Sequence, residues 1–347
     1  MLLKKNFVYS IGMVIFQIFL GCSYDGDSPE ICVQQYPSGE ESSEKIVAGI
    51  KDVLQENLFD FDYQFTTDEY SLKTTLNNCS VILDVSTRNL SEWRKGDEII
   101  IPFTVYKDNS ALGEESVMFS IQNTREGGIL LSFDDYFDCW NTYLQSFVDY
   151  DIKATFFCFG DYSRFGAFAT KAQNAGLEVG YHTLNHTALT MCDTKEECIA
   201  QTITPLATLR DKYVYLDSFA FPNGAWLPYN MELLLEYYKI LRLFDNHFRL
   251  YSIDDIAEKR IIFSQSIDKN KFEDESDFKD KMIKRMVLAK ITGKIYPCTT
   301  HYILTNEGEI SSDAYTISKE NLIWLFETVN SLNCKTYCYK DIYPYMY

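Results

Sequence analysis

From Gly127 onward, short apolar runs alternate with stretches whose apolar residues recur at helical spacing. The runs predict strands, and the spaced positions predict helices with one buried face. Alternating strands and helices imply a parallel sheet with helices outside it. With roughly six to eight such units, a closed or partly closed barrel is the economical arrangement. The expected strands are 129–133, 154–159, 177–181, 219–221, 241–244, 261–263, 294–299 and 335–339, and the expected helices lie near 140–148, 231–240, 277–291 and 318–332.

Local signals add helix boundaries to this pattern. Gly176 is a natural stop for the helix that precedes strand 177–181. The segment Asp193-Thr-Lys-Glu196 resembles a capping box and opens a helical stretch that continues to Leu209. Pro205 lies inside that stretch, so we expect the helix to be kinked or split there.

Residues 45–123 have a different pattern. A short helix is predicted at 46–54, followed by extended segments at 81–85, 98–106 and 117–121. Turn signals such as Lys95-Gly-Asp97 separate the extended segments. This part predicts a small β-rich domain, for which a sandwich is one form, in front of a barrel domain at 124–347.

The first residues carry a processing signal. Lys4 and Lys5 precede an apolar run at 7–20 that is too short and interrupted to span a membrane. Such a segment reads as a secretory signal peptide, residues 1–21. Its end, Leu20-Gly-Cys22, resembles a bacterial lipobox, so Cys22 is the expected lipidation site and residues 22–44 the expected tether. An ordinary signal with a chance cysteine is the alternative.

The charge of the chain limits its partners. The formal net charge is −18, which argues against nucleic acid, since phosphates attract Lys and Arg. A lipid anchor on Cys22 implies a membrane as a partner and a place in the cell envelope. Asp25 and Asp27 resemble surface-export signals of some Gram-negative lipoproteins, so we expect the outer membrane, with the cell surface as one option.

The ten cysteines contain no CxxC pair, so a cysteine zinc site is not expected. Without Cys22, nine remain, and at least one is unpaired within the chain. Cys192 with Cys198, and Cys334 with Cys338, are close enough in sequence to form disulfides if the geometry allows. Two further cysteines lie in strand-like runs and are expected to be buried thiols: Cys158 and Cys298.

The histidines and one pair of aspartates follow predicted strands. Asp134 and Asp135 end the first strand, and His182 and His186 follow the third. The other two histidines, His247 and His301, come after strands 241–244 and 294–299. Such folds carry their chemistry at the carboxyl ends of the strands. An HxxxH pair alone is a weak signal, but two imidazoles and a carboxylate on one rim suit a catalytic divalent metal.

These motifs resemble those of the polysaccharide deacetylases, the NodB-homology domain of carbohydrate esterase family four. The resemblance covers about 127–347, and the motifs appear in family order. They are Ser132-Phe-Asp-Asp135, His182-Thr-Leu-Asn-His186, Phe219-Ala-Phe-Pro-Asn-Gly224 and Thr300-His301. The family implies an α/β fold, a distorted, incomplete (β/α) barrel.

The resemblance also implies roles for individual residues. Asp135, His182 and His186 would hold the metal, with zinc as the first choice and cobalt, nickel or iron as the others. Asp134 would be the general base and His301 the general acid. The backbone N–H of Asn223, which follows Pro222, would help to hold the oxyanion.

The chain departs from the family pattern at its third motif. Ala220 occupies the position where many members have an Arg that orients the catalytic Asp, and Asn223 replaces a frequent Tyr. The Phe-Ala-Phe-Pro form is more similar to the branch that includes poly-N-acetylglucosamine deacetylases. Arg242, on the next predicted strand, is a candidate for the missing cation.

The expected function is therefore metal-dependent removal of acetyl groups from N-acetylated sugars of a polysaccharide or glycan. An O-acetyl polysaccharide esterase is a second reading, since the family contains both. A non-catalytic, carbohydrate-binding lipoprotein is a third, and an adhesion or scaffold protein is a fourth that rests only on the β-rich domain.

Aromatic residues near the motifs are candidate sugar contacts. Trp226, Tyr229 and Tyr302 lie close to the third and last motifs, where their rings could stack on sugars, although ordinary packing is the alternative. Trp140 falls on a helix face and is expected in the core. His247 has no counterpart in the motifs and is either a rim contact or a surface residue.

Overall fold

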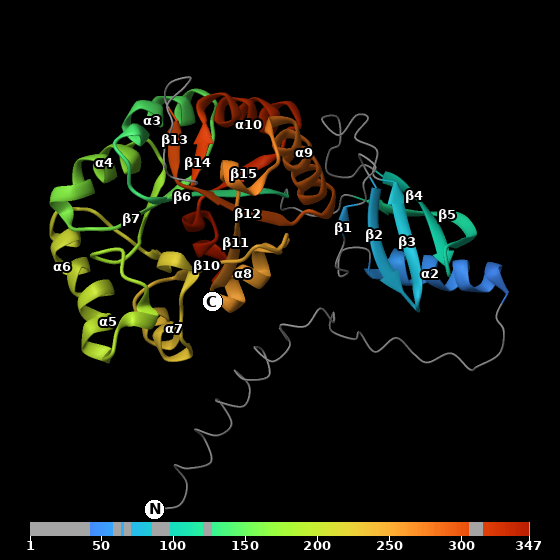
Figure 1. The fold of residues 1–347 in the computed structure, drawn as a ribbon, viewed down its shortest axis with the longest axis horizontal. Coiled ribbons are helices and arrows are strands. Elements are labelled where there is room, and N and C mark those ends of the chain that lie inside the picture. Colours follow the sequence, from blue (N-terminus) through green and yellow to red (C-terminus); the bar gives the residue numbers. More distant parts are fainter. Residues whose placement is uncertain are drawn as a thin grey trace, which may run out of the picture. The chain divides into compact units, whose positions relative to one another are not determined.

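The computed structural model describes residues 42–57, 64–65, 71–84, 98–120, 127–304 and 315–346, which divide into two compact units (Figure 1). The predicted signal peptide, Cys22 and nearly all of the tether lie outside the described residues. Within these ranges, no helix has the length and apolar character needed to cross a membrane. The predicted domain boundary at 123 falls at residues that the structure does not describe, and it stays a prediction.

The first unit is one β-sheet packed against one helix. Its strands follow one another in space, and the first four pair antiparallel. Burial alternates along β2 and β3, so one face of the sheet is covered, and the helix contributes Val47, Ile50 and Leu54 to that core. The unit is β-rich, as expected, but its described residues form a single sheet rather than a sandwich. Its elements are α2 (Ser43–Asn57), β1 (Gln64–Phe65), β2 (Ser71–Leu76), β3 (Cys79–Asp84), β4 (Glu98–Lys107) and β5 (Ser110–Ser120).

The second unit is a parallel barrel, which confirms the predicted fold class. Seven strands, β6 to β12, pair in chain order, and the pairing of β12 with β6 closes the ring. All of these pairings are parallel. The strands are β6 (Gly128–Asp135), β7 (Thr155–Cys158), β8 (Glu178–Tyr181), β9 (Ser218–Ala220), β10 (Ile240–Phe244), β11 (Ile261–Ser266) and β12 (Ile295–Thr300).

The barrel is distorted around β6. On one side, β6 pairs with β12 from Gly128 to Phe133. On the other side, β15 (Lys335–Tyr337) pairs with the first residues of β6, and β7 pairs with the last four. The ring therefore has one strand fewer than an eight-stranded barrel, and the last strand of the chain fills part of the gap.

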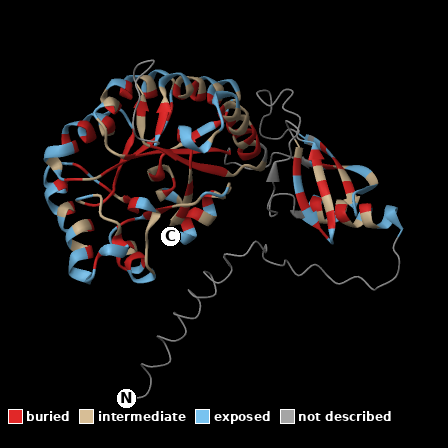
Figure 2. Ribbon diagram, in the orientation of Figure 1, coloured by how far each residue is buried: buried red, intermediate tan, exposed pale blue. Residues whose placement is uncertain are grey.

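Helices surround the barrel, with exposed residues on their outer faces and buried residues along the strands (Figure 2). Pro205 splits one predicted helix into α5 and α6 at Ile203, as expected. The cap of α5 lies one residue later than predicted, because the side chain of Thr194 accepts from Glu197 N. The helices are α3 (Cys139–Asp149), α4 (Tyr162–Asn174), α5 (Lys195–Thr202), α6 (Thr204–Asp211), α7 (Pro228–Leu235), α8 (Ile253–Lys259), α9 (Glu275–Thr292) and α10 (Lys319–Ser331).

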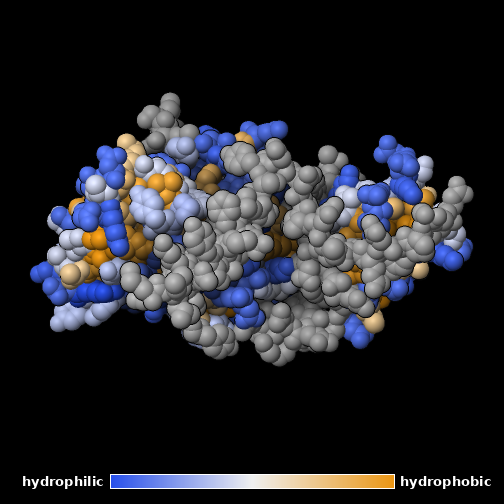
Figure 3. Space-filling model, turned by 90° about the horizontal axis from the view of Figure 1, so that it is seen from below, coloured by the Kyte–Doolittle hydropathy of each residue, from blue (hydrophilic) through white to orange (hydrophobic). Residues whose placement is uncertain are grey.

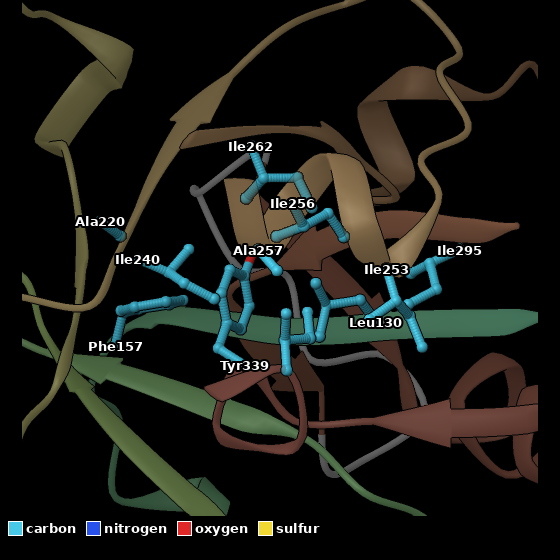
Figure 4. Packing of buried hydrophobic residues seen from close by; sticks show 11 residues of the cluster. Leu130, Phe157, Ala220, Ile240, Ile253, Ile256, Ala257, Ile262, Ile295 and Tyr339 are labelled. Atoms are coloured by element: carbon cyan, nitrogen blue, oxygen red, sulfur yellow. The ribbon is translucent and has the colours of Figure 1, made fainter. Parts of the chain in front are cut away.

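The C-terminal segment closes the amino end of the barrel. Figure 4 shows Tyr339 packed between Phe157, Leu130 and Ile240, and its ring centroid lies 5.2 Å from that of Phe157. At the same end, the buried carboxylate of Glu178 accepts hydrogen bonds from Thr155, Ser218, Tyr343 and the backbone of Lys340, so its hydrogen-bonding capacity is used. The carboxyl ends of the strands lie at the opposite end of the barrel.

The cysteines of the described ranges are free thiols, including both predicted disulfide pairs. Cys158 and Cys298 are buried in strands, as expected.

On the face of the molecule in Figure 3, hydrophilic and hydrophobic side chains are interspersed over the described surface of each unit.

Candidate active site

Six polar side chains gather at the carboxyl ends of the barrel strands. They come from β6, β8, β10, β11 and β12 or the residues that follow them, so positions up to 167 residues apart share one rim. The side chains are Asp134, Asp135, His182, Arg242, Asp268 and His301, and the loop after His182 adds His186.

Asp135, His182 and His186, the candidate metal triad, converge on one point. Their candidate ligand atoms all lie within 4.8 Å of one another. Asp135 Oδ1 lies 3.3 Å from His182 Nε2 and 2.9 Å from His186 Nε2, yet this buried oxygen makes no well-directed hydrogen bond. A buried carboxylate oxygen that faces two imidazole nitrogens without such a bond fits a position between them for a cation.

A backbone carbonyl fixes the tautomer of His182. The ring nitrogen Nδ1 lies 2.8 Å from the carbonyl oxygen of Ala220 on β9. A carbonyl can only accept, so Nδ1 carries the proton and Nε2 presents its lone pair to the site. Ala220 therefore acts through its backbone here, whatever its side chain.

Turns with strained backbone bring these side chains together. Asp135, Tyr136, Thr183, His186 and Asn223 all have positive φ, between 55° and 86°. Such conformations cost energy for residues other than Gly, and they cluster at functional sites. Adjacent side chains in an extended strand point to opposite faces. The positive φ of Asp135 interrupts the extended backbone, so that Asp134 and Asp135 can both face the site.

Arg242 is the buried partner of Asp134. Its Nη2 donates to Asp134 Oδ2, and both side chains are at most 5% exposed. Arg242 is the direct neighbour of Ala220 in the pairing of β10 with β9. Ala220, at the third-motif position on β9, supplies no cation. The guanidinium that contacts Asp134 comes instead from Arg242 on the next strand, β10.

His301 is held by two contacts. Its Nδ1 lies 3.0 Å from Asp268 Oδ2, while Nε2 faces Asp134 Oδ2 at 3.9 Å. Asp268 is fully buried and also accepts from Thr300 Oγ1 and Ser266 Oγ. Trp140, buried as predicted, donates its indole N–H to the backbone oxygen of His301.

The charges of the site act on its histidines. Burial disfavours protonation of His301, but the hydrogen bond and charge of Asp268, together with Asp134 and Asp135, raise the pKa of His301 to about 9. Contact with Asp135 raises the pKa of His186. Burial opposes ionisation of Asp135, but the two imidazoles outweigh it and hold the pKa of Asp135 well below its usual range.

The His301 shift predicts a pH-dependent stability. The folded pKa of about 9 exceeds the unfolded value of about 6.5, so the stabilisation is complete below pH ~6.5 and is lost as the pH rises through 9. Asp268→Asn removes the main partner, so the metal-free variant should lose less unfolding free energy between pH 6 and 9 than the metal-free parent. Urea unfolding at pH 6, 7.5 and 9 measures this, with Asp280→Asn on α9 as the control. Equal slopes in parent and Asp268→Asn would contradict it.

The remaining predicted residues follow the strands β9 and β10. Pro222 and Asn223 occupy the turn after β9, and Trp226 follows it half-buried. His247 is 80% exposed and its Nδ1 contacts Asp245 Oδ1 at 2.6 Å, so the structure pairs it with the end of β10. The substrate roles of Asn223, Pro222 and Trp226 stay predictions.

Asp268 is the residue that sequence reasoning missed. It follows β11 by two residues, in Ser266-Ile-Asp268, which is the same kind of signal that marked Asp135 and His301. The predicted strand ended at 263, so the aspartate did not stand at a strand end. A longer strand would have placed it on the rim.

Comparison with known proteins confirms the family resemblance. Residues 121–237, about a third of the chain, match the family model described as polysaccharide deacetylase. That segment contains the first three motifs, from Ser132 to Gly224. No curated protein matches the sequence.

Several solved structures are similar to this chain at low identity. A peptidoglycan N-acetylglucosamine deacetylase shares 15% identity and covers 63% of this chain and 92% of its own, with a TM-score of 0.42. A family 4 acetyl xylan esterase from Clostridium thermocellum, in complex with a cobalt ion, shares 16% identity and covers 62% of this chain and 90% of its own, with a TM-score of 0.39. A mutant of a pseudoenzyme of the same family, with restored activity, shares 14% identity and covers 85% of this chain and 97% of its own, with a TM-score of 0.42.

Proposed function

We propose that this chain, whose residues 121–237 match the polysaccharide deacetylase family, is a metal-dependent hydrolase that removes acetyl groups from N-acetylated sugars of a polysaccharide or glycan. One observation carries the proposal. The cluster of Asp135, His182 and His186 lies beside a carboxylate and an imidazole that can act as base and acid, Asp134 and His301.

The donor set fits a divalent transition metal. Two neutral imidazoles and one carboxylate leave positions open for water and substrate, as catalytic zinc sites do, and they also suit cobalt, nickel and iron. When bound, such an ion would polarise the acetyl carbonyl and make a bound water more acidic. Zinc is our first choice.

Asp134 is the proposed base. Its Oδ2 is engaged by Arg242, while its buried Oδ1 has no hydrogen-bond partner. The ion pair fixes the orientation of the carboxylate. Oδ1 is then the oxygen available to accept a proton from the attacking water.

His301 is the proposed acid. The carboxylate of Asp268 accepts from Nδ1–H, which directs Nε2–H toward the site. With a pKa raised to about 9, the ring carries its proton at neutral pH and can give it to the departing nitrogen. An amine leaves poorly without that proton, so this arrangement supports amide substrates.

Asn223 is the proposed backbone donor for the oxyanion. Its φ of 56° places it in a tight turn directly after the buried Pro222. A backbone N–H is present with any side chain except Pro, so the replacement of the frequent Tyr by Asn leaves this donor in place.

The complete acid–base set supports an enzyme over a decayed sugar-binding protein. An O-acetyl esterase is distinguished by its leaving group, because an alcohol needs less protonation than an amine. His301→Ala should therefore lower acetate release far more from an N-acetylated sugar than from an O-acetylated one. Equal losses on both substrates would favour neither class.

Metal content tests the proposal directly. We expect about one divalent ion per chain in the mature protein, and its loss in His182→Ala, because two ligand atoms hold a transition metal weakly. His247→Ala is the matched control, since it removes another rim histidine outside the triad. Elemental analysis measures the ion, and acetate release from N-acetylated oligosaccharides then tests the activity. If the parent holds no ion after soaking in zinc or cobalt, the proposal of a metal-dependent hydrolase is rejected.

We further propose that lipid on Cys22 anchors the protein in the cell envelope, at the outer membrane. The lipobox-like Leu20-Gly-Cys22 supports this. Cys22→Ser should abolish incorporation of labelled fatty acid and move the protein from the membrane fraction to the soluble fraction. Labelling that persists in Cys22→Ser would rule the anchor out.

A further inference from the structure

Tyr315 lies beside the proposed acid through a connection outside the barrel sheet. Directly after His301, β13 (Tyr302–Leu304) pairs in parallel with β14 (Thr316–Ser318). The pairing sets Tyr302 against Thr316, and Tyr302 N donates to the backbone oxygen of Tyr315 at 3.3 Å. The ring centroids of Tyr315 and His301 lie 5.2 Å apart at an angle of 54°.

The ring of Tyr315 is open to solvent where a packed aromatic would be buried. It is 49% exposed, although it stands next to a largely buried imidazole. Among the large, exposed apolar residues of the described ranges, Tyr315 is the one that contacts a side chain of the site. The others are Ile100, Met118, Val148, Met191, Tyr213, Tyr215, Tyr229 and Tyr237.

A second aromatic contacts the site, but a cation covers it. Phe159 lies 5.4 Å from the ring of His186, and the guanidinium of Arg164 lies 3.9 Å from the Phe159 centroid. Gly160 gives Arg164 room for this position, since a Cβ there would meet Arg164 Cδ at 2.5 Å. On the metal side the aromatic is therefore capped, whereas on the acid side it is not.

We infer that Tyr315 is a stacking platform for a pyranose ring of the substrate, on the His301 side of the site. The inference rests on the proposed function. The acid must reach the nitrogen that departs with the sugar, so the ring that carries this nitrogen, or its neighbour in the chain, lies beside His301. The C–H face of a pyranose is apolar, and it packs on a half-exposed tyrosine while its hydroxyls stay in water.

The test separates sugar binding from chemistry at the acetyl group. Tyr315→Ala, Tyr315→Phe and the control Tyr237→Ala, an aromatic of similar exposure remote from the site, are compared on two substrates. One is a pentamer of N-acetylglucosamine, and the other is 4-methylumbelliferyl acetate, which has no sugar. Tyr315→Ala should raise KM for the pentamer about tenfold and change kcat/KM for the ester less than about twofold. Tyr315→Phe and Tyr237→Ala should resemble the parent.

Binding of the same pentamer to the metal-free protein is measured by calorimetry. This measurement keeps the inference independent of turnover. If the parent releases no acetate but Tyr315→Ala weakens binding of the pentamer about tenfold, the stacking role of Tyr315 is supported and the proposed hydrolase function is rejected. A lower kcat for the pentamer at unchanged KM would instead mean that Tyr315 only positions His301. The platform would be overturned if the parent did not bind the pentamer, or if Tyr315→Ala bound it as tightly as the parent does.

Discussion

Replacing Asp134 with Asn is expected to lower the rate of acetate release about 10²- to 10⁴-fold, the usual contribution of a positioned general base. Asn has nearly the same shape, but its amide cannot accept the proton of the attacking water. The three candidate metal ligands are untouched, so the variant should keep its ion. Turnover and elemental analysis on the same preparation measure both effects.

The control for this variant is Asp245→Asn. Asp245 is another rim aspartate with an arginine partner, Arg249, and it lies outside the triad. It should keep most of the activity. Loss of the ion in Asp134→Asn would reassign Asp134 as a ligand, and full activity would remove it as the base.

Arg242→Met is expected to cost about 3–5 kcal/mol of unfolding free energy, because it leaves the carboxylate of Asp134 buried without its cation. Activity should fall as well, because the carboxylate of Asp134 loses the ion pair that fixes its orientation. Urea unfolding and the rate of acetate release measure the two effects. Arg249→Met, which breaks the exposed pair with Asp245, should change the stability by less than about 1 kcal/mol.

A double variant separates positioning from stability. Ala220 and Arg242 are direct neighbours on paired strands, so Ala220→Arg combined with Arg242→Ala moves the cation back by one strand. Arg242→Ala removes the side chain of the residue paired with position 220, and the carbonyl of Ala220 that holds His182 is part of the backbone. We expect partial recovery of the rate of acetate release. A double variant no better than Arg242→Ala would contradict an interchangeable role for the two positions.

Much of the barrel was predictable from local pattern. Buried parallel strands are continuous apolar runs, and the helices that cover them bury one face, so both leave a clear period in the sequence. Strand β2 escaped prediction because threonines and a lysine separate its apolar residues, Leu72 and Leu76. The first unit is β-rich, as predicted, and in its described residues one helix, rather than a second sheet, packs on the buried face of the sheet.

The sequence by itself determined which residues form the candidate site. Asp134 and Asp135 end a strand, and His182 and His301 each follow one. Parallel strands bring their carboxyl ends to one rim whatever their exact register. Only the tertiary structure decided how these groups are supported. The pairing of Arg242 with Asp134, of Asp268 with His301 and of Tyr315 with the same ring depends on which strands are neighbours and on their register. Those are non-local properties: the partners lie 14 to 108 residues apart in the chain, and no local period records which of them will meet.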